Sequence, residues 1–165
     1  MNEVYLIRHG IAALREDYAN DEERPLTKKG RKKTKKVAKR LHKLGLKFDR
    51  ILTSPLLRSR QTAKILKAAK LSSHLEISPH LAPEGNIHSW IPWLEQWQQQ
   101  HPNKSLALVG HQPDLANWAE ILLWWEARDK IILKKAGIIG LKLPGTGNPI
   151  GQSSIFCAIS PKWLL

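Results

Sequence analysis

An arginine and a histidine, Arg8 and His9, stand directly after a short apolar run near the start of the chain, residues 4–7 (VYLI). Such a run predicts a buried strand, and in open α/β sheets ligands bind at the carboxyl ends of the strands. Gly10 follows the pair and lets the backbone turn sharply and approach a ligand. The tripeptide alone is a weak signal, and its value depends on residues later in the chain.

Two further residues occupy the same kind of position. Arg58 comes shortly after a second predicted strand, and His111 follows the clearest strand of the chain, residues 106–109 (LALV). Because the carboxyl ends of parallel strands lie at one edge of a sheet, these residues could converge with Arg8 and His9. Arginine is not a metal ligand and Cys157 is the single cysteine, so neither a metal nor another cofactor is expected.

Two arginines and two histidines together suit phosphoryl chemistry. Guanidinium groups form forked hydrogen bonds to phosphate oxygens and stay charged at any working pH. Stabilising those oxygens is most of what phosphoryl transfer requires of a protein. A neutral histidine such as His9 is a competent nucleophile that can form a covalent intermediate. Each residue alone is more often an ordinary polar side chain, and only the joint pattern favours a site.

The rest of the pattern alternates strands and helices. The apolar runs predict strands over residues 3–7, 49–53, 75–77, 106–109, 136–143 and 155–159. Helices are predicted over residues 28–44, capped by Thr27, over 57–69, through the tryptophan-rich segment from residue 90, and over 113–125. Residues 11–26 are predicted as a loop. This alternation indicates an α/β three-layer sandwich, with a mainly parallel central sheet covered by helices on both faces, in a single domain over residues 1–165.

Trp90, Trp93, Leu94 and Trp97 lie at helical spacing, which is more typical of core packing than of a ligand site. Pro92 falls among them and is expected in the first turn of the helix, where a proline is tolerated.

The charge balance is unusual for a chain of 165 residues. The formal net charge is +13, and ten basic residues with no acid fall between Lys28 and Lys43. Such a stretch favours an anionic partner such as nucleic acid or an acidic protein. A solvated helix face that aids solubility explains it equally well. The longest apolar runs are too short to span a bilayer and no signal peptide is evident, so a cytoplasmic location without membrane attachment is expected.

Three segments in order resemble the motifs of the histidine phosphatase superfamily. They are residues 7–10 (IRHG), 54–62 (SPLLRSRQT) and 109–111 (VGH). Residues 24–27 (RPLT) add a likeness to the short SixA-type phosphohistidine phosphatases. The resemblance implies a phosphoglycerate mutase-like fold, a nucleophilic His9 that becomes phosphorylated, and a phosphate pocket of Arg8, Arg58 and His111. It also implies Arg24 as a further substrate contact.

The chain departs from the larger enzymes of that superfamily, which carry a helical insertion that supplies a glutamate as proton donor. Here the candidates for a general acid are Glu84, Asp21, Glu22 or none. An alkoxide leaving group needs a placed acid, whereas the imidazole of phosphohistidine can take its proton from solvent near its pKa of about 6.5. The expected activity is therefore a phosphatase for phosphohistidine on a signalling protein, such as a histidine phosphotransfer domain of a two-component system.

Two alternatives remain from the sequence. One is a phosphatase of another small or protein phosphomonoester. The other is a basic module that binds nucleic acid or an acidic protein on a phosphatase-like scaffold, and a steep loss of affinity with salt would mark nucleic-acid binding. The enzyme and binding roles also combine if the lysine-rich helix docks an acidic protein substrate and raises the encounter rate.

Overall fold

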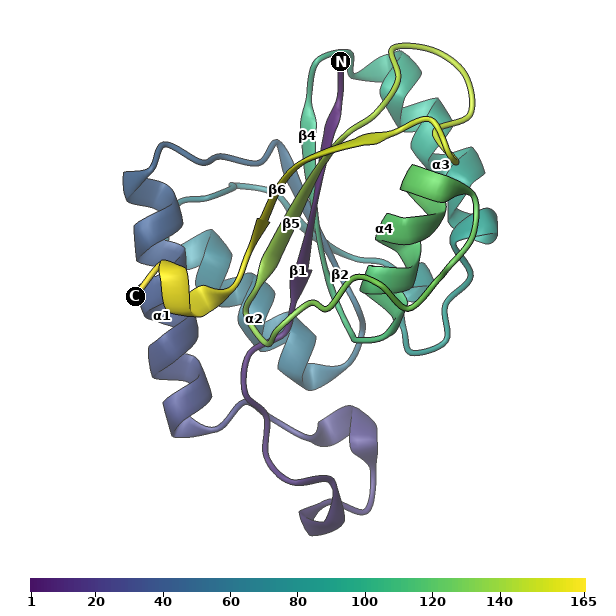
Figure 1. Ribbon diagram of the computed structural model, residues 1–165. Helices are drawn as coiled ribbons and strands as arrows, with labels where there is room; N and C mark the ends of the chain where they lie inside the picture. The colour runs from purple at the N-terminus through teal and green to yellow at the C-terminus, as the bar shows by residue number, and fades with distance from the viewer.

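The centre of the computed structural model, which describes residues 1–165, is a six-stranded sheet (Figure 1). Its strands are β1 (Glu3–Arg8), β2 (Arg50–Thr53), β3 (Leu75–Ile77), β4 (Ser105–Gly110), β5 (Ile138–Lys142) and β6 (Ser154–Ile159), in the order β3-β2-β4-β1-β5-β6. The four strands from β3 to β1 run parallel, whereas β5 is antiparallel to β1 and β6 to β5. The sheet is therefore mixed, and its parallel part carries the residues of interest.

Helices cover both faces of this sheet, as predicted. Figure 1 shows α1 (Lys28–Lys43) and α2 (Leu57–Ala68) on one side, and α3 (Ile87–Gln100) and α4 (Asp114–Trp124) on the other. Short 3₁₀ turns complete the chain: η1 (Arg15–Asp17), η2 (Asp21–Glu23), η3 (Pro79–Leu81) and η4 (Pro161–Trp163). The predicted three-layer sandwich is confirmed. No helix has the length and apolar character required to cross a membrane.

Alternation along the buried strands produces two separate hydrophobic cores. Val4 and Leu6 of β1 pack toward α3 and α4, with Trp90, Leu94 and Trp97 in the same cluster. The intervening residues of β1, Tyr5 and Ile7, pack with Val37 and Leu41 of α1 and with Leu66 of α2. This alternation is typical of a strand that is buried on both faces. Packing from both sides therefore fixes the end of β1, where Arg8 lies and after which His9 follows.

The basic helix α1 begins where the sequence predicts. The side-chain oxygen of Thr27 accepts a hydrogen bond from the backbone N–H of Gly30 at 2.9 Å, which satisfies one free donor of the first turn. Gly30 also lies so close to the loop after β1 that an added Cβ would stand 2.0 Å from the carbonyl oxygen of Ile11. The start of α1 is therefore packed directly against the segment that follows His9.

The position predicted for Pro92 is wrong. α3 begins at Ile87, and its cap Asn86 accepts from the N–H of His88, so Pro92 lies in the sixth helical position rather than in the first turn. A proline there removes one helical hydrogen bond and costs about 3 kcal/mol. Complete burial of Trp90 and Leu94, on either side of it, offsets this cost.

Candidate active site

The order of the strands places the two histidines next to each other. β1 and β4 are parallel neighbours, paired so that Arg8 lies opposite Gly110. His9 and His111 directly follow these two strands, and their ring centroids are 5.3 Å apart. Both side chains are buried, at 6% and 5% exposure. Two residues about one hundred positions apart in sequence thus meet at one edge of the sheet, as their strand-end positions predict.

His9 is held in one tautomer by its own backbone. Its Nδ1 lies 2.7 Å from the carbonyl oxygen of Gly10, and because a carbonyl can only accept, Nδ1 carries the proton. Nε2 therefore keeps its lone pair. Burial lowers the pKa of His9 to about 3, and the charges of Arg58 and Arg8 also favour the neutral ring. A neutral, oriented imidazole is the form that can attack phosphorus.

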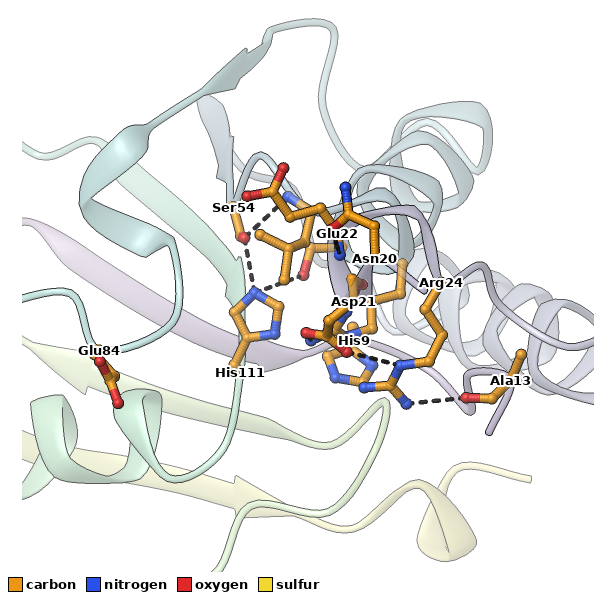
Figure 2. A network of polar contacts seen from close by, with 12 residues as sticks. His9, Ala13, Asn20, Asp21, Glu22, Arg24, Ser54, Glu84 and His111 are labelled. Carbon is orange, nitrogen blue, oxygen red and sulfur yellow. Dashed lines mark hydrogen bonds and ion pairs between the residues drawn. The ribbon is translucent and has the colours of Figure 1, made fainter. Parts of the chain in front are cut away.

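His111 is oriented by Ser54, the residue that follows β2. The Ser54 hydroxyl lies 2.7 Å from Nε2 of His111 and also accepts the N–H of Leu56 at 3.2 Å (Figure 2). Its hydroxyl proton is then free to be donated to Nε2, which leaves the imidazole proton on Nδ1. That Nδ1 is buried and has no protein partner. Burial lowers the pKa of His111 to about 4, so the ring is a neutral donor.

Arg58 and Arg24 share one carboxylate. Arg58 donates from Nη2 to Oδ2 of Asp21 at 3.0 Å and from Nη1 to the Asp21 carbonyl oxygen at 2.9 Å. Arg24 donates from Nε to the other carboxylate oxygen, Oδ1, at 3.0 Å, and from Nη1 to the carbonyl oxygen of Ala13 (Figure 2). The structure thus brings Arg24 into the cluster. An oxyanion held by two guanidinium groups is the geometry that a phosphoryl group also needs.

Arg8 approaches the cluster from β1. Its Nη1 donates to the carbonyl oxygen of Leu133 at 3.1 Å, and its buried Nε has no protein partner. The Nε of Arg58, whose side chain is 5% exposed, is likewise buried without a partner. Buried donors of this kind are costly to leave unpaired, and they are commonly found where a ligand binds.

One hydroxyl connects the loop after β1 to α2. The N–H of Gly10 donates to Oγ1 of Thr62 at 3.0 Å, and the same hydroxyl donates to the carbonyl oxygen of Arg58 at 2.9 Å. Thr62 therefore links the backbone of Gly10, which follows His9, to the backbone of Arg58.

The three carboxyl groups considered as a general acid differ in their surroundings. Desolvation raises the pKa of Asp21, but hydrogen bonds and charges from Arg58 and Arg24 outweigh it and lower that pKa below its usual value. Asp21 is thus ionised at neutral pH. Glu84 lies apart from the cluster in Figure 2, and its N–H donates to Asp114 at the start of α4. Glu22 is exposed in the same turn as Asp21 and forms no ion pair.

Sequence reasoning missed Ser54, Thr62 and the role of Asp21 as the partner of both arginines. A serine after a strand and a threonine within a helix carry no signature of their own, although both lie within the segment 54–62 that marks the family. The sequence identifies Asp21 only as a candidate acid, because its pairing with the arginines depends on how the loop 11–26 folds. That loop contains two 3₁₀ turns and a single bridge between Ala12 and Leu26, which bring η2 over α2.

Replacing Ser54 by alanine is expected to lower kcat about tenfold with a smaller change in KM, because His111 loses its short hydrogen bond at Nε2 and keeps only a longer contact of 3.5 Å with the hydroxyl of Ser59. Ser54→Thr, which keeps the hydroxyl, should restore most of the rate. Nitrogen NMR of labelled histidine provides the second readout, since the alanine variant should show His111 as a mixture of tautomers. A single unchanged tautomer together with a reduced rate would contradict this role.

The two buried histidines predict that stability falls in mild acid. An unfolded imidazole titrates near 6.5, whereas the folded values are about 3 for His9 and 4 for His111. The unfolded chain takes up protons first, so stability present above pH 6.5 is lost as the pH falls toward the folded values. At about pH 5 the loss should be about 2 kcal/mol for each histidine, measurable by urea unfolding. The double variant His9→Gln/His111→Gln should lose most of this dependence, and a variant as acid-sensitive as the wild type would refute the assignment.

Comparison of the sequence with known protein families identifies the family of this chain. Residues 4–90 match the model of the histidine phosphatase superfamily (branch 1). The chain belongs to that superfamily. The matched segment contains β1, α1, β2 and α2, and therefore Arg8, His9, Arg24 and Arg58, while His111 lies beyond it.

Relatives extend the likeness over the whole chain. An uncharacterised protein of Picosynechococcus sp. is 51% identical over 99% of both chains. Phosphohistidine phosphatase SixA of Escherichia coli (strain K12) is 37% identical over 67% of this chain and 68% of its own. The solved structure of the protein histidine phosphatase SixA complexed with tungstate superimposes with a TM-score of 0.85, at 27% identity and 99% coverage of both chains.

The same fold also carries other phosphatases. A phosphoserine phosphatase from Entamoeba histolytica, solved in complex with phosphoserine, matches all of this chain with a TM-score of 0.74 at 19% identity. The match to the family model and the likeness to SixA identify the chain as an enzyme of the histidine phosphatase superfamily. Members that share this fold differ in their substrates.

Proposed function

We propose that this protein removes the phosphoryl group from phosphohistidine on a signalling protein, such as a histidine phosphotransfer domain. The observation that carries the proposal is the state of His9. Its Nδ1–H is occupied by Gly10, its ring is neutral, and it lies beside His111 within the field of Arg8 and Arg58. The likeness to SixA proteins supports the choice of phosphohistidine.

In the proposed reaction, Nε2 of His9 attacks the phosphorus atom of the substrate. The P–N bond to the substrate imidazole breaks as the bond to Nε2 forms, and the released ring takes its proton from solvent. The guanidinium groups of Arg8 and Arg58, with Nδ1–H of His111, stabilise the charge on the phosphoryl oxygens. Water then cleaves the bond between His9 and phosphorus, which releases phosphate and restores the neutral ring.

The surroundings of the acids support phosphohistidine over an alkyl phosphate. Asp21 is ionised and bound to two arginines, Glu84 lies apart from the histidines, and Glu22 is exposed to solvent. Substitution of Glu22 tests the remaining candidate directly. An alkoxide leaving group needs a positioned proton donor, whereas an imidazole with a pKa of about 6.5 does not.

The decisive experiment compares a phosphotransfer domain labelled on its histidine with a simple alkyl phosphate. We expect loss of label to proceed with a kcat/KM at least about 100-fold higher than hydrolysis of the alkyl ester. Glu22→Gln should leave the phosphohistidine rate unchanged, because no dedicated acid is required. Equal rates on the two substrates, or a large loss in Glu22→Gln, would contradict the proposed substrate.

A further inference from the structure

A cleft of about 550 Å³ opens beside the candidate active site, and its charged lining is entirely basic. Arg8 lines it together with four lysines: Lys33, Lys134, Lys135 and Lys162. Ile11, Ser160 and Pro161 complete the lining, which contains no carboxylate. None of the four lysines forms a salt bridge.

Three separate segments bring these lysines together. Lys33 lies on α1, Lys134 and Lys135 precede β5, and Lys162 lies in η4. Figure 1 draws the C-terminal turn η4 against α1. Leu164, which follows η4, belongs to the same buried cluster as Val37 and Leu41 of α1, so the turn is held there by packing. Packing in the core therefore fixes the positions of the segments that line the cleft.

The positive charges of the cleft and the candidate active site affect each other. Burial lowers the pKa of Lys135, and the charges of Arg8 and Arg24 lower it further. Like charges held this close repel one another, and a ligand with negative charge relieves the repulsion. A group bound here would lie next to a phosphoryl group held by Arg8.

Resting on the proposed function, we propose that this cleft docks an acidic segment of the phosphoprotein substrate, with carboxylate side chains beside the phosphorylated residue. The extent of the basic surface favours a protein segment over a small metabolite. From Lys33 the surface continues along α1, which carries ten basic residues, no acid and no ion pair. A helix of 16 residues is about 24 Å long, well beyond the reach of a single small anion.

The test uses two synthetic peptides that contain one phosphohistidine, one flanked by Asp and Glu and the other by Asn and Gln. Wild type should hydrolyse the acidic peptide with a kcat/KM at least about tenfold higher. The triple variant Lys33→Glu/Lys134→Glu/Lys162→Glu should erase this preference, whereas hydrolysis of free phosphohistidine, which has no acidic flanks, should fall by no more than about threefold. Lys135 is left intact because its charge couples to Arg8 and Arg24.

A matched control variant carries the same three lysine-to-glutamate changes at a different cleft. Lys47, Lys67 and Lys70 surround a different cleft, near the amino-terminal end of β2, and their replacement by glutamate should preserve the preference for the acidic peptide. Equal rates of wild type on the two peptides would overturn the docking proposal. So would an equal loss on free phosphohistidine, or the same effect in the control triple variant.

Binding separates this proposal from the proposed function. The acidic peptide without phosphate, labelled with a fluorophore, should bind wild type more tightly than the cleft triple variant. If wild type hydrolyses neither peptide nor free phosphohistidine, the proposed function fails, and docking is decided by this difference in Kd alone. Equal Kd values would overturn docking, as would tighter binding of duplex DNA than of the peptide at about 0.15 M salt, lost in the same variant.

Discussion

Replacing His9 by alanine is expected to lower phosphatase activity by at least about 10³-fold on every phosphoryl substrate. The imidazole is the nucleophile of the first step in the proposed mechanism, and no covalent intermediate can form without Nε2. With a substrate labelled on its phosphoryl group, rapid quenching should trap label on the wild-type chain and none on the variant.

The loss should be chemical rather than structural. The neutral side chain of His9 makes one hydrogen bond, to the carbonyl oxygen of Gly10, so His9→Ala should still fold, as judged by circular dichroism and thermal melting. His9→Asn, which keeps a donor near that carbonyl, should be equally inactive. The control is His88→Ala, an exposed histidine on α3, which should retain full activity. A His9→Ala rate within tenfold of wild type would exclude His9 as the nucleophile.

Replacing Arg58 by alanine is expected to lower kcat/KM about 10²-fold to 10³-fold. Its side chain is buried and its unpartnered Nε lies within the cluster, so alanine removes a charge that solvent cannot replace. Inhibition by tungstate, a phosphate-like oxyanion, should weaken by a similar factor. Arg58→Lys should recover only part of the rate, because an ammonium group keeps the charge but lacks the fork.

The carboxylate of Asp21 provides a second readout of the same substitution. Arg58 holds the pKa of Asp21 down through a hydrogen bond and through its charge, while Arg24 keeps its own bond to Oδ1. In Arg58→Ala the pKa of Asp21 should therefore rise, which carbon NMR of the carboxyl group measures. Lys64→Ala, an exposed position on α2, should change neither the activity nor this pKa.

The elements with strong periodicity and clear caps could be predicted from the sequence. β1, β4 and α1 appear within about one residue of their expected bounds, because a buried apolar run and the Thr27 cap are local signals. The convergence of the two histidines could also be predicted, since it follows from parallel strands that end at one edge. The antiparallel attachment of β5 and β6 could not, because an apolar run does not specify the direction of pairing.

The details of the site depend on tertiary contacts that no local sequence pattern indicates. Asp21 pairs with Arg58 across 37 positions, and this requires the particular path of the loop 11–26. Ser54 reaches His111 only because β2 and β4 are neighbours in the sheet. The sequence does not predict Pro92 inside α3, because burial of the flanking Trp90 and Leu94 overrides helix propensity and depends on the packed core.

The adjacency of β1 and β4 has a consequence for how the enzyme comes into being. The two strands pair across about one hundred residues of chain, and each contributes one histidine at its end. Long-range pairing of this kind closes late and slowly, since much chain must be ordered before it forms. Because β4 lies between β1 and β2, a chain in which β4 has not yet paired lacks His111 beside His9, and its phosphate site is incomplete. The active site is therefore complete only once all the parallel strands have paired. Recovery of activity after denaturation should then report complete assembly of the sheet.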